Sequence, residues 1–358
     1  MKSLQNKSIL VTGSCGTIGS ELVRQLLEED FRIKKLIALD IDETGIFFQE
    51  QRFISENRAS FYVQDIKDRN GLVEKCQGVD VIFHTAAMKH VGLCEKSPDQ
   101  AIQTNILAVE NIIYAAKLSC VEVVIFTSSD KAVNPTNVMG TSKLMGERIF
   151  TAANSYKSKK TTIFASTRFG NVLGSSGSVI PIFFNQISKG GPVTLTDEKM
   201  TRFVMSVSQA VKLVIHSSLI AKGGEVFITK MPVINIKDLA LSMIEILSKQ
   251  NQIDQNIKIE LIGSKPGEKL FEELMTSEEL NRSIELNDYF IVLPAFRGIY
   301  KNISYQYANT ITDKVERLYV SNTQKALTVD EIKTFLITNK LISKPNEDST
   351  VRFWPGDK

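Results

Sequence analysis

The sequence has few of the side chains on which metal sites and disulfide frameworks depend. Its three histidines, His84, His90 and His216, are not spaced like metal ligands. Its four cysteines form no C-x-x-C pair, which favours reduced thiols over a disulfide framework or a zinc site. We therefore expect a cytoplasmic protein without a bound metal.

Long apolar runs and an excess of one charge are also missing. Nowhere do 18 apolar residues follow one another, and no apolar signal segment precedes Ser8. The 43 lysines and arginines are dispersed among 40 aspartates and glutamates, without interleaved aromatics. These absences argue against a membrane segment and against nucleic acid as the main partner. The 43% of hydrophobic and 23% of charged residues are typical of a globular protein.

The first half of the chain alternates short β-like runs with helix-like segments, as in a parallel sheet with crossover helices. Strands are expected at residues 8–12, 35–40, 59–64, 79–84, 121–127 and 161–168. Helical periodicity covers residues 20–29 and 101–117. Later in the chain, helices are expected at residues 206–219, 236–249 and 270–275, and a strand at 225–229 that returns to the main sheet.

These patterns predict an α/β fold: a Rossmann-type doubly wound parallel sheet with a smaller C-terminal substrate-binding lobe. The expected division of the chain is a Rossmann domain at 1–170 plus about 205–230, the smaller lobe at 171–204 and 231–342, and a polar tail at 343–358.

A glycine-rich turn follows the first predicted strand. Gly13, Gly16 and Gly19 have T-G-x-x-G-x-x-G spacing, which lets the backbone approach a pyrophosphate at the start of the next helix. Asp40, at the end of the second strand, can accept hydrogen bonds from ribose hydroxyls and repels a 2′-phosphate. The turn therefore predicts a dinucleotide site that prefers NAD. An ordinary glycine loop and a turn aspartate are the alternatives.

A second motif follows the fifth predicted strand. Residues 129–143 read S-D-K-A-V-N-P-T-N-V-M-G-T-S-K, with Met139 four positions before Lys143, so that both lie on one helix face. With the glycine turn, this resembles the extended short-chain dehydrogenase/reductase superfamily, in which a Tyr-x-x-x-Lys helix serves a bound nicotinamide. Here methionine, which cannot exchange a proton, stands in place of tyrosine.

The whole motif resembles one branch of that superfamily, the UDP-N-acetylglucosamine 4,6-dehydratases of the polysaccharide biosynthesis (CapD-like) family. Further similar stretches are H-T-A-A-M-K-H-V at 84–91, R-F-G-N-V-L-G-S-S-G-S-V-I-P at 168–181, M-T-R-F at 200–203 and P-G-E-K-L-F-E-E-L at 266–274. The resemblance spans most of the chain. Ser129 stands where many relatives have threonine, and Lys265 where arginine is common. Both replacements keep the type of functional group, a hydroxyl and a positive charge.

The resemblance implies NAD as cofactor and a nucleotide sugar as substrate, the former on the Rossmann domain and the latter on the lobe. The implied cofactor-binding residues are Gly13, Cys15, Gly16, Thr17, Ile18, Asp40, Asp65, Ile66, Ala86, Ala87 and Lys143. The implied catalytic residues are Ser129, Asp130, Lys131, Met139 and Lys143. The implied substrate-binding residues are Lys89, His90, Asn171, Ser178, Val179, Pro181, Arg202 and Glu268. For His90 a packing role, and for Asp65 a strand-end cap, are the alternatives.

The expected reaction is oxidation at sugar C4, elimination of water across C5 and C6, and return of the hydride to C6. Our hypothesis is that Asp130 protonates the C6 oxygen and that Lys131, neutral beside Lys143, removes the C5 proton. The C4 hydroxyl proton passes through Ser129 to Asp130 or to a lysine, and the sequence leaves this choice open, as it does retention or inversion at C5. A solvated turn pair is the alternative for the Asp-Lys pair.

Two other functions compete with the dehydratase: a UDP-N-acetylglucosamine 4-epimerase, and a non-catalytic NAD-binding protein. The Asp-Lys pair favours the dehydratase, because an epimerase needs no acid at C6 or base at C5. The chain begins at the first strand and resembles the short soluble form of the family, so we expect a homo-oligomer, dimer or hexamer. The resemblance also implies a role in bacterial surface-glycan biosynthesis.

Overall fold

The computed structural model describes residues 3–155, 162–174, 179–251, 257–263, 268–300 and 303–342. The chain divides into two compact units. The first comprises Met1–Phe169, Ser208–Lys230 and Glu273–Tyr319, and the second comprises Gly170–Val207, Met231–Glu272 and Val320–Lys358. Among the described residues, no helix is long and apolar enough to cross a membrane.

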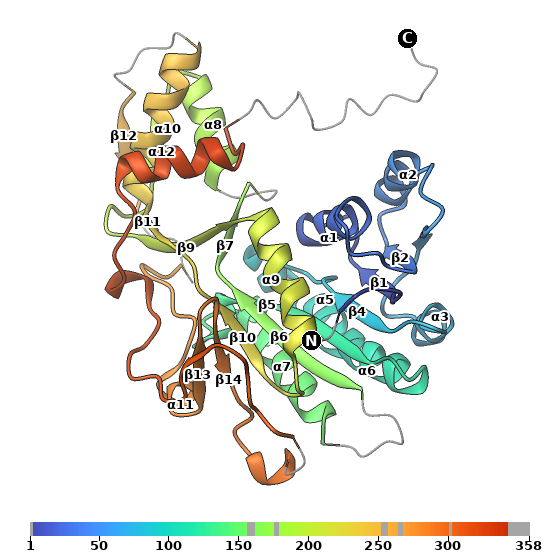
Figure 1. The fold of residues 1–358 in the computed structure, drawn as a ribbon. Coiled ribbons are helices and arrows are strands. Elements are labelled where there is room, and N and C mark those ends of the chain that lie inside the picture. Colours follow the sequence, from blue (N-terminus) through green and yellow to red (C-terminus); the bar gives the residue numbers. More distant parts are fainter. Residues whose placement is uncertain are drawn as a thin grey trace, which may run out of the picture. The chain divides into compact units, whose positions relative to one another are not determined.

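A ten-stranded sheet forms the centre of the first unit, in the order β15-β13-β14-β10-β6-β5-β4-β1-β2-β3 (Figure 1). Its strands are β1 (Ser8–Thr12), β2 (Lys35–Asp40), β3 (Ala59–Val63), β4 (Val81–His84), β5 (Val123–Ser129), β6 (Ile163–Phe169), β10 (Val226–Thr229), β13 (Ser283–Leu286), β14 (Tyr289–Val292) and β15 (Thr310–Thr312). The pairs from β3 across to β10 are parallel, and β14, β13 and β15 continue the sheet antiparallel. The Rossmann-type fold is confirmed by the strand order 3-2-1-4-5-6 within this sheet.

Helices cover both faces of this sheet (Figure 1). They are α1 (Thr17–Glu28), α2 (Glu43–Arg52), α3 (Arg69–Lys75), α4 (Val91–Lys96), α5 (Pro98–Ile102), the π-helix η1 (Gln103–Leu107), α6 (Ala108–Leu118), the 3-10 turn η2 (Asp130–Ala132), α7 (Val138–Ala153), α9 (Val207–Ile220), α11 (Ser277–Leu280) and the 3-10 turn η3 (Arg297–Tyr300). On one face, side chains of α3, α6 and α7 share a core with Leu10, Ile82 and Phe126. On the other, Gln25 of α1 bonds to Ser208 of α9. Strands β1 and β4 are buried along their length because both faces are covered.

The second unit is smaller and mixed. Its strands are β7 (Asn171–Leu173), β8 (Val193–Leu195), β9 (Thr201–Ser206), β11 (Val233–Asn235) and β12 (Ile259–Leu261). They form a three-stranded sheet β11-β9-β7 and a parallel pair β12-β8. The helices are α8 (Val179–Ser188), α10 (Ile236–Asn251), α12 (Val329–Thr338) and the 3-10 turn η4 (Ser321–Thr323). Apolar side chains of α8, α10 and α12 share one core, which holds this unit together.

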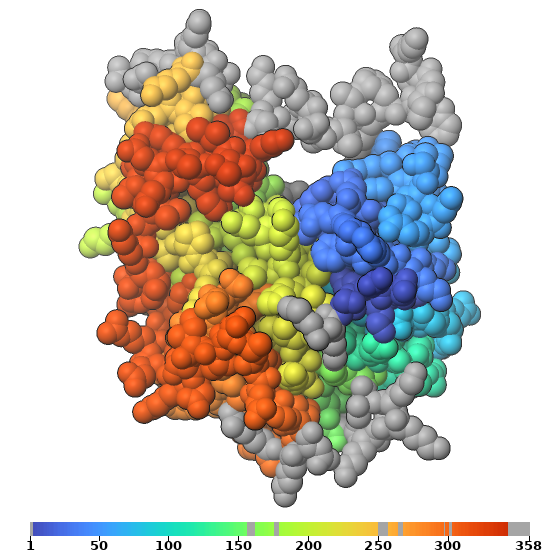
Figure 2. Space-filling model, viewed as in Figure 1, coloured from blue at the N-terminus to red at the C-terminus, as the bar shows by residue number. Residues whose placement is uncertain are grey.

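Besides the division of the helix expected at 101–117 into α5, η1 and α6, the structure differs from the sequence prediction in the C-terminal half of the chain. Residues 270–275, expected as a helix, have no helical structure, because their backbone groups bond to distant partners such as Tyr319. Residues 273–319, expected in the smaller lobe, belong to the first unit, because β14 pairs with β10 and extends the main sheet. Figure 2 shows the orange surface of this segment adjoining the yellow surface of α9, to which Tyr289 donates a hydrogen bond.

Candidate functional site

The glycine turn between β1 and α1 is built around close backbone contacts. Gly13 has a φ of +70°, and a Cβ there would lie 2.6 Å from the backbone of Ala86. A Cβ on Gly19 would lie 2.0 Å from the carbonyl oxygen of Gly13. Only glycine fits at these positions, so the turn brings the N-terminus of α1 close to the end of β4. Thr17 and Ile18 form the first turn of that helix.

A pocket of about 720 Å³ lies at the carboxyl ends of β1, β2, β3 and β4. Its size is within the range of small-molecule sites. Eight of the eleven residues predicted to bind a cofactor line it: Gly13, Cys15, Gly16, Asp40, Asp65, Ile66, Ala86 and Ala87. The residues suit an adenine dinucleotide, because a glycine turn and helix start meet a strand-end carboxylate, the arrangement that holds pyrophosphate and ribose.

Asp40 is held in a fixed orientation in this pocket. Its Oδ2 accepts a hydrogen bond of 2.8 Å from the amide of Cys15, and its Oδ1 accepts one of 3.0 Å from the amide of Asp42. Lone pairs on both oxygens stay available to ribose hydroxyls. Burial, followed by the charge of Asp40, raises the pKa of Cys15 to about 12, so this thiol is neutral.

The pocket also includes residues that the sequence analysis did not select. Gln64 and Lys67 flank the predicted pair after β3, and Met88, Gln100 and Thr104 come from the segment after β4 and its helices. Gln64 and Lys67 could have been found from their place at the strand end. Gln100 and Thr104 had no such signal, since their approach depends on how α5 and η1 pack.

A compact acid–base cluster follows β5. The Ser129 hydroxyl donates a 2.6 Å hydrogen bond to Oδ1 of Asp130, and Nζ of Lys131 lies 3.1 Å from Oδ2. Asp130 is 5% exposed, whereas the Lys131 side chain is 34% exposed. A buried carboxylate that accepts from a hydroxyl can take up a proton through it and later give that proton to another oxygen.

Lys143 lies on the buried face of α7. Its Nζ donates a 3.0 Å hydrogen bond to the carbonyl oxygen of Thr127 and lies 4.5 Å from the centre of the Phe126 ring. Burial lowers the pKa of Lys143 to about 8, although the charge of Glu147 opposes this shift. The ammonium group is therefore held beside the end of β5, close to the point where its charge can be lost.

Met139 is 4% exposed and belongs to a small core with Cys94 and Ala101. The side chain in the place of tyrosine is thus a packing residue without a proton to exchange. His90 caps the start of α4 without a side-chain hydrogen bond to the helix, and it is exposed. Lys89 beside it is exposed in part, and burial lowers the pKa of its amine.

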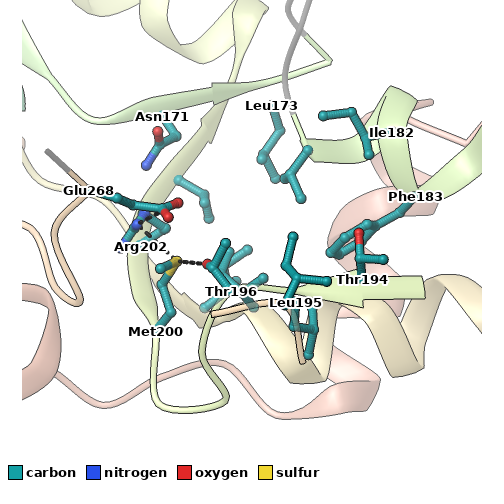
Figure 3. Close-up of a pocket in the computed structure, with 15 residues that line it drawn as sticks. Asn171, Leu173, Ile182, Phe183, Thr194, Leu195, Thr196, Met200, Arg202 and Glu268 are labelled. Atoms are coloured by element: carbon teal, nitrogen blue, oxygen red, sulfur yellow. Dashed lines mark hydrogen bonds and ion pairs between the residues drawn. The ribbon is translucent and has the colours of Figure 1, made fainter. Parts of the chain in front are cut away.

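The second unit contains a pocket of about 330 Å³ with two different ends (Figure 3). Asn171, Arg202 and Glu268 form its polar end, and Ile182 and Phe183 lie at the apolar end. Such a lining suits a molecule with a flat, weakly polar ring and an attached polar group.

The Arg202 guanidinium at this polar end is already engaged by the protein. Its Nη atoms donate to the carbonyl oxygens of Thr201, Lys269 and Leu270 and to the sulfur of Met200. Its Nε lies 3.4 Å from Oε1 of Glu272, and an Nη lies 4.0 Å from Glu268. A phosphate oxygen that binds Arg202 would therefore have to replace one of these partners. Nothing in the sequence indicated that the guanidinium is already engaged.

The other predicted substrate residues differ in how they relate to this pocket. Asn171 donates a 2.6 Å hydrogen bond to Glu272, which fixes its amide at the pocket wall. Val179 lines the pocket at the start of α8, whereas Pro181 is exposed on the same helix outside the lining. Ser178 lies outside the described residues.

A family model described as "Polysaccharide biosynthesis protein" matches residues 9–294 of the chain. An uncharacterized membrane protein of Methanocaldococcus jannaschii is 49% identical over 81% of this chain and 86% of its own. A UDP-glucose 4-epimerase of Rickettsia canadensis is 34% identical over 93% of this chain and 96% of its own length. The capsular polysaccharide biosynthesis protein CapD of Staphylococcus aureus is 42% identical over 78% of this chain, which spans only 47% of that protein.

Among solved structures, the X-ray structure of Pen from Bacillus thuringiensis superposes with a TM-score of 0.85 at 39% identity, covering 95% of this chain and 99% of that one. A dTDP-glucose 4,6-dehydratase, DesIV of Streptomyces venezuelae with bound NAD, superposes with a TM-score of 0.64 at 22% identity, over 74% and 86%. At 22% identity, the likeness to DesIV shows a shared fold and no more.

Proposed function

Because the chain belongs to the polysaccharide biosynthesis protein family, we propose that it is an NAD-dependent 4,6-dehydratase of UDP-N-acetylglucosamine. The product is a UDP-4-keto-6-deoxy-N-acetylhexosamine. The observation that carries the proposal is the Ser129–Asp130–Lys131 cluster, in which a buried carboxylate contacts a hydroxyl and an amine. Elimination of water needs both an acid and a base beyond the group that serves oxidation.

The first unit holds the cofactor in this proposal. The glycine turn and the start of α1 bind the pyrophosphate, Asp40 accepts from the adenosine ribose, and Lys143 binds the nicotinamide ribose. NAD held by these residues would supply the acceptor and donor of the hydride that the reaction needs. The carboxylate of Asp40 repels a 2′-phosphate, which favours NAD over NADP.

The protons are moved by residues of this chain. Asp130 receives the C4 hydroxyl proton through Ser129, because that hydroxyl already donates to its Oδ1. Protonation of Asp130 removes the ion-pair partner of Lys131, whose partly exposed amine then releases its proton to solvent. The neutral amine of Lys131 removes the C5 proton, which the C4 ketone has made acidic, and Asp130 gives its proton to the C6 oxygen, which departs as water. Met139 is buried against Cys94 and Ala101 and takes no proton.

The uridine part of the substrate is assigned to the pocket of the second unit. The base occupies the apolar end, and Glu268 accepts from the ribose hydroxyls at the polar end. Arg202 supplies positive charge near the diphosphate.

A 4-epimerase is the second candidate, favoured by the 34% identity to a protein described as UDP-glucose 4-epimerase. The purified chain, incubated with NAD and UDP-N-acetylglucosamine, separates the candidates by mass spectrometry of the products. A product that is about 18 mass units lighter than the substrate, the mass of one water molecule, and that carries a 4-keto group supports the dehydratase. Formation of UDP-N-acetylgalactosamine supports the epimerase, and absence of any conversion contradicts both.

A further inference from the structure

A fully buried arginine is bonded to Glu147, which lies on the same helix as the lysine that is proposed to hold the cofactor. Arg168, at the end of β6, is 0% exposed, and each of its five N–H groups has an acceptor. Nε and Nη2 donate to the two oxygens of Glu147 at 3.0 and 2.6 Å. Nη1 and Nη2 donate to the two oxygens of Glu279 at 3.0 and 3.1 Å, and Nη1 also donates to the Leu274 carbonyl at 2.8 Å.

Glu147 connects this arginine to Lys143. The two residues are four positions apart on α7, so their side chains lie on the same helix face, and they are only 2% and 6% exposed. The charge of Glu147 raises the pKa of Lys143 against the lowering caused by burial. Glu279 belongs to a remote segment, where it also closes the capping box of α11 with Thr276.

The four buried charges cancel. Lys143 and Arg168 carry two positive charges, and Glu147 and Glu279 carry two negative ones. Burial raises the pKa of Glu279, but the attraction of Arg168 overcomes this and lowers it to about 2, so the carboxylate is charged at neutral pH. Buried charges are tolerated only when they are paired in this way.

The other titratable groups around α7 are neutral, paired, or exposed to solvent. Arg148 of α7 and Glu95 of α4, which accepts from the Val138 amide, are exposed and carry opposite charges. Burial and then the charge of Lys143 lower the pKa of His84 on β4 to about 3, and burial raises the pKa of Cys94 on α4, so both are neutral. Asp130 and Lys131 on η2 pair with each other. Arg282, 4.0 Å from Glu279, is paired with Glu278.

We propose that Glu147, Arg168 and Glu279 are positioning residues that form a charge-balanced group with Lys143 and thereby keep its amine protonated under working conditions. This proposal rests on the proposed function, in which Lys143 binds the nicotinamide ribose. Glu147 acts directly as the neighbouring carboxylate. The positive charge of Arg168 weakens the effect of Glu147 on the Lys143 amine, and the negative charge of Glu279 compensates for Arg168. Glu279, more than a hundred positions away in the sequence, therefore contributes to the protonation of Lys143.

The charge balance predicts shifts in the pKa of Lys143 that a purely structural role of these residues would not produce. Removing a carboxylate leaves the group with one excess positive charge, which lowers the pKa of Lys143 below about 8. Removing the arginine charge leaves one excess negative charge, which raises it. Removing one of each restores the balance. The single variants therefore shift the titration of Lys143 in opposite directions, and the double variant returns it.

The test is an NMR titration of the lysine amines in the full chain with NAD, using ¹³C-labelled lysine and Lys143→Arg to identify the Lys143 signal. Glu279→Gln is expected to lower the titration midpoint of Lys143 by about one pH unit, and Arg168→Met to raise it by about as much. Arg168→Met with Glu279→Gln is expected to lie within about half a unit of the wild type. Glu50→Gln, which removes an exposed carboxylate of α2, is the matched control and should leave the midpoint unchanged.

Equal midpoints in all variants, or shifts of both single variants in the same direction, would overturn the proposal. If Arg168→Met fails to fold, Glu147→Gln and Glu147→Asp replace it. The first must lower the midpoint, and the second, which keeps the charge, must restore it. The titration needs no turnover, so its result does not depend on whether UDP-N-acetylglucosamine is converted. Failure of this proposal and failure of the proposed function are therefore detected by different measurements.

Discussion

Asp130 and Lys143 carry opposite charges near the end of β5, and each is held by its own partners. Asp130 contacts Ser129 and Lys131, whereas Lys143 contacts the Thr127 carbonyl and the Phe126 ring. The carboxylate is thereby oriented for proton transfer and the amine for binding a cofactor. Met139 packs with Cys94 and Ala101 and leaves proton exchange to Asp130 with Ser129 and Lys131.

Asp40 provides the residue-scale test of cofactor choice. Asp40→Asn keeps the shape of the side chain and one acceptor oxygen, replaces the other acceptor with an NH2 donor, and removes the negative charge that repels a 2′-phosphate. We expect the preference for NAD over NADP, measured as the ratio of dissociation constants by fluorescence titration, to fall about tenfold. Asp330→Asn, a 92% exposed aspartate of α12, should leave the ratio unchanged. An unaltered preference in Asp40→Asn would show that the carboxylate does not select the cofactor.

At the scale of elements, the sequence predicts β1 and β2 to the residue, because short apolar runs there end at glycine or aspartate. The helix expected at 101–117 is three elements, α5, η1 and α6, because buried Asn105 in the π-helix bonds to Met88 and Ser142. No periodicity of apolar residues reveals such a tertiary contact. The same holds for residues 270–275, whose apolar pattern resembles that of a helix although the backbone bonds elsewhere.

The turn between β1 and α1 can be tested with a matched pair of glycines. Gly13 and Gly78 both have positive φ, +70° and +71°, but only Gly13 is crowded, since a Cβ on Gly78 would meet nothing within 4 Å. Gly13→Ala is expected to weaken NAD binding at least about tenfold. Gly78→Ala should cost about 1 kcal/mol of unfolding free energy through backbone strain alone and leave NAD binding intact. Equal NAD affinity in both variants would contradict the assigned turn.

The contact of β6 with α11 predicts a defined loss of stability in acid. The pKa of Glu279 is about 2 in the folded chain against an ordinary value of 4.5, because burial, which raises it, is outweighed by Arg168, which stabilises the charged carboxylate. Its contribution to stability is therefore complete above about pH 4.5 and is lost as the pH falls through 2. This corresponds to about 3 kcal/mol of unfolding free energy. Urea unfolding of wild type and Glu279→Gln should therefore differ less at pH 2.5 than at pH 6. A difference independent of pH would contradict the assigned ion pair.

At the scale of the whole molecule, each unit has its own pocket and its own set of lining residues. The sequence predicts the two-part organisation and eight of the nineteen residues that line the first pocket, because strand ends and glycines signal them. It misplaces residues 273–319, because their membership depends on long-range pairing of β14 with β10. It also gives no sign that the Arg202 donors are all engaged by the protein.

Separate pockets predict separable binding defects. Glu268→Gln is expected to weaken UDP binding about tenfold, because the ribose hydroxyls lose a charged acceptor, and to leave NAD binding unchanged. Gly13→Ala should do the reverse. Glu198→Gln, an exposed carboxylate of the second unit, serves as the control for Glu268→Gln. Isothermal titration with each ligand measures both effects, and a variant that loses both ligands together would contradict the assignment.

The central claim is that Lys131 and Asp130 remove the C5 proton and deliver a proton to the C6 oxygen. Its most direct test is conversion of UDP-N-acetylglucosamine in deuterated water, with the product analysed by NMR and mass spectrometry. The account predicts deuterium at C5 of a 4-keto-6-deoxy product from the wild type. It predicts a rate reduced by about 100-fold or more in Lys131→Ala and in Asp130→Asn. Wild-type rates and wild-type labelling in both variants would contradict it.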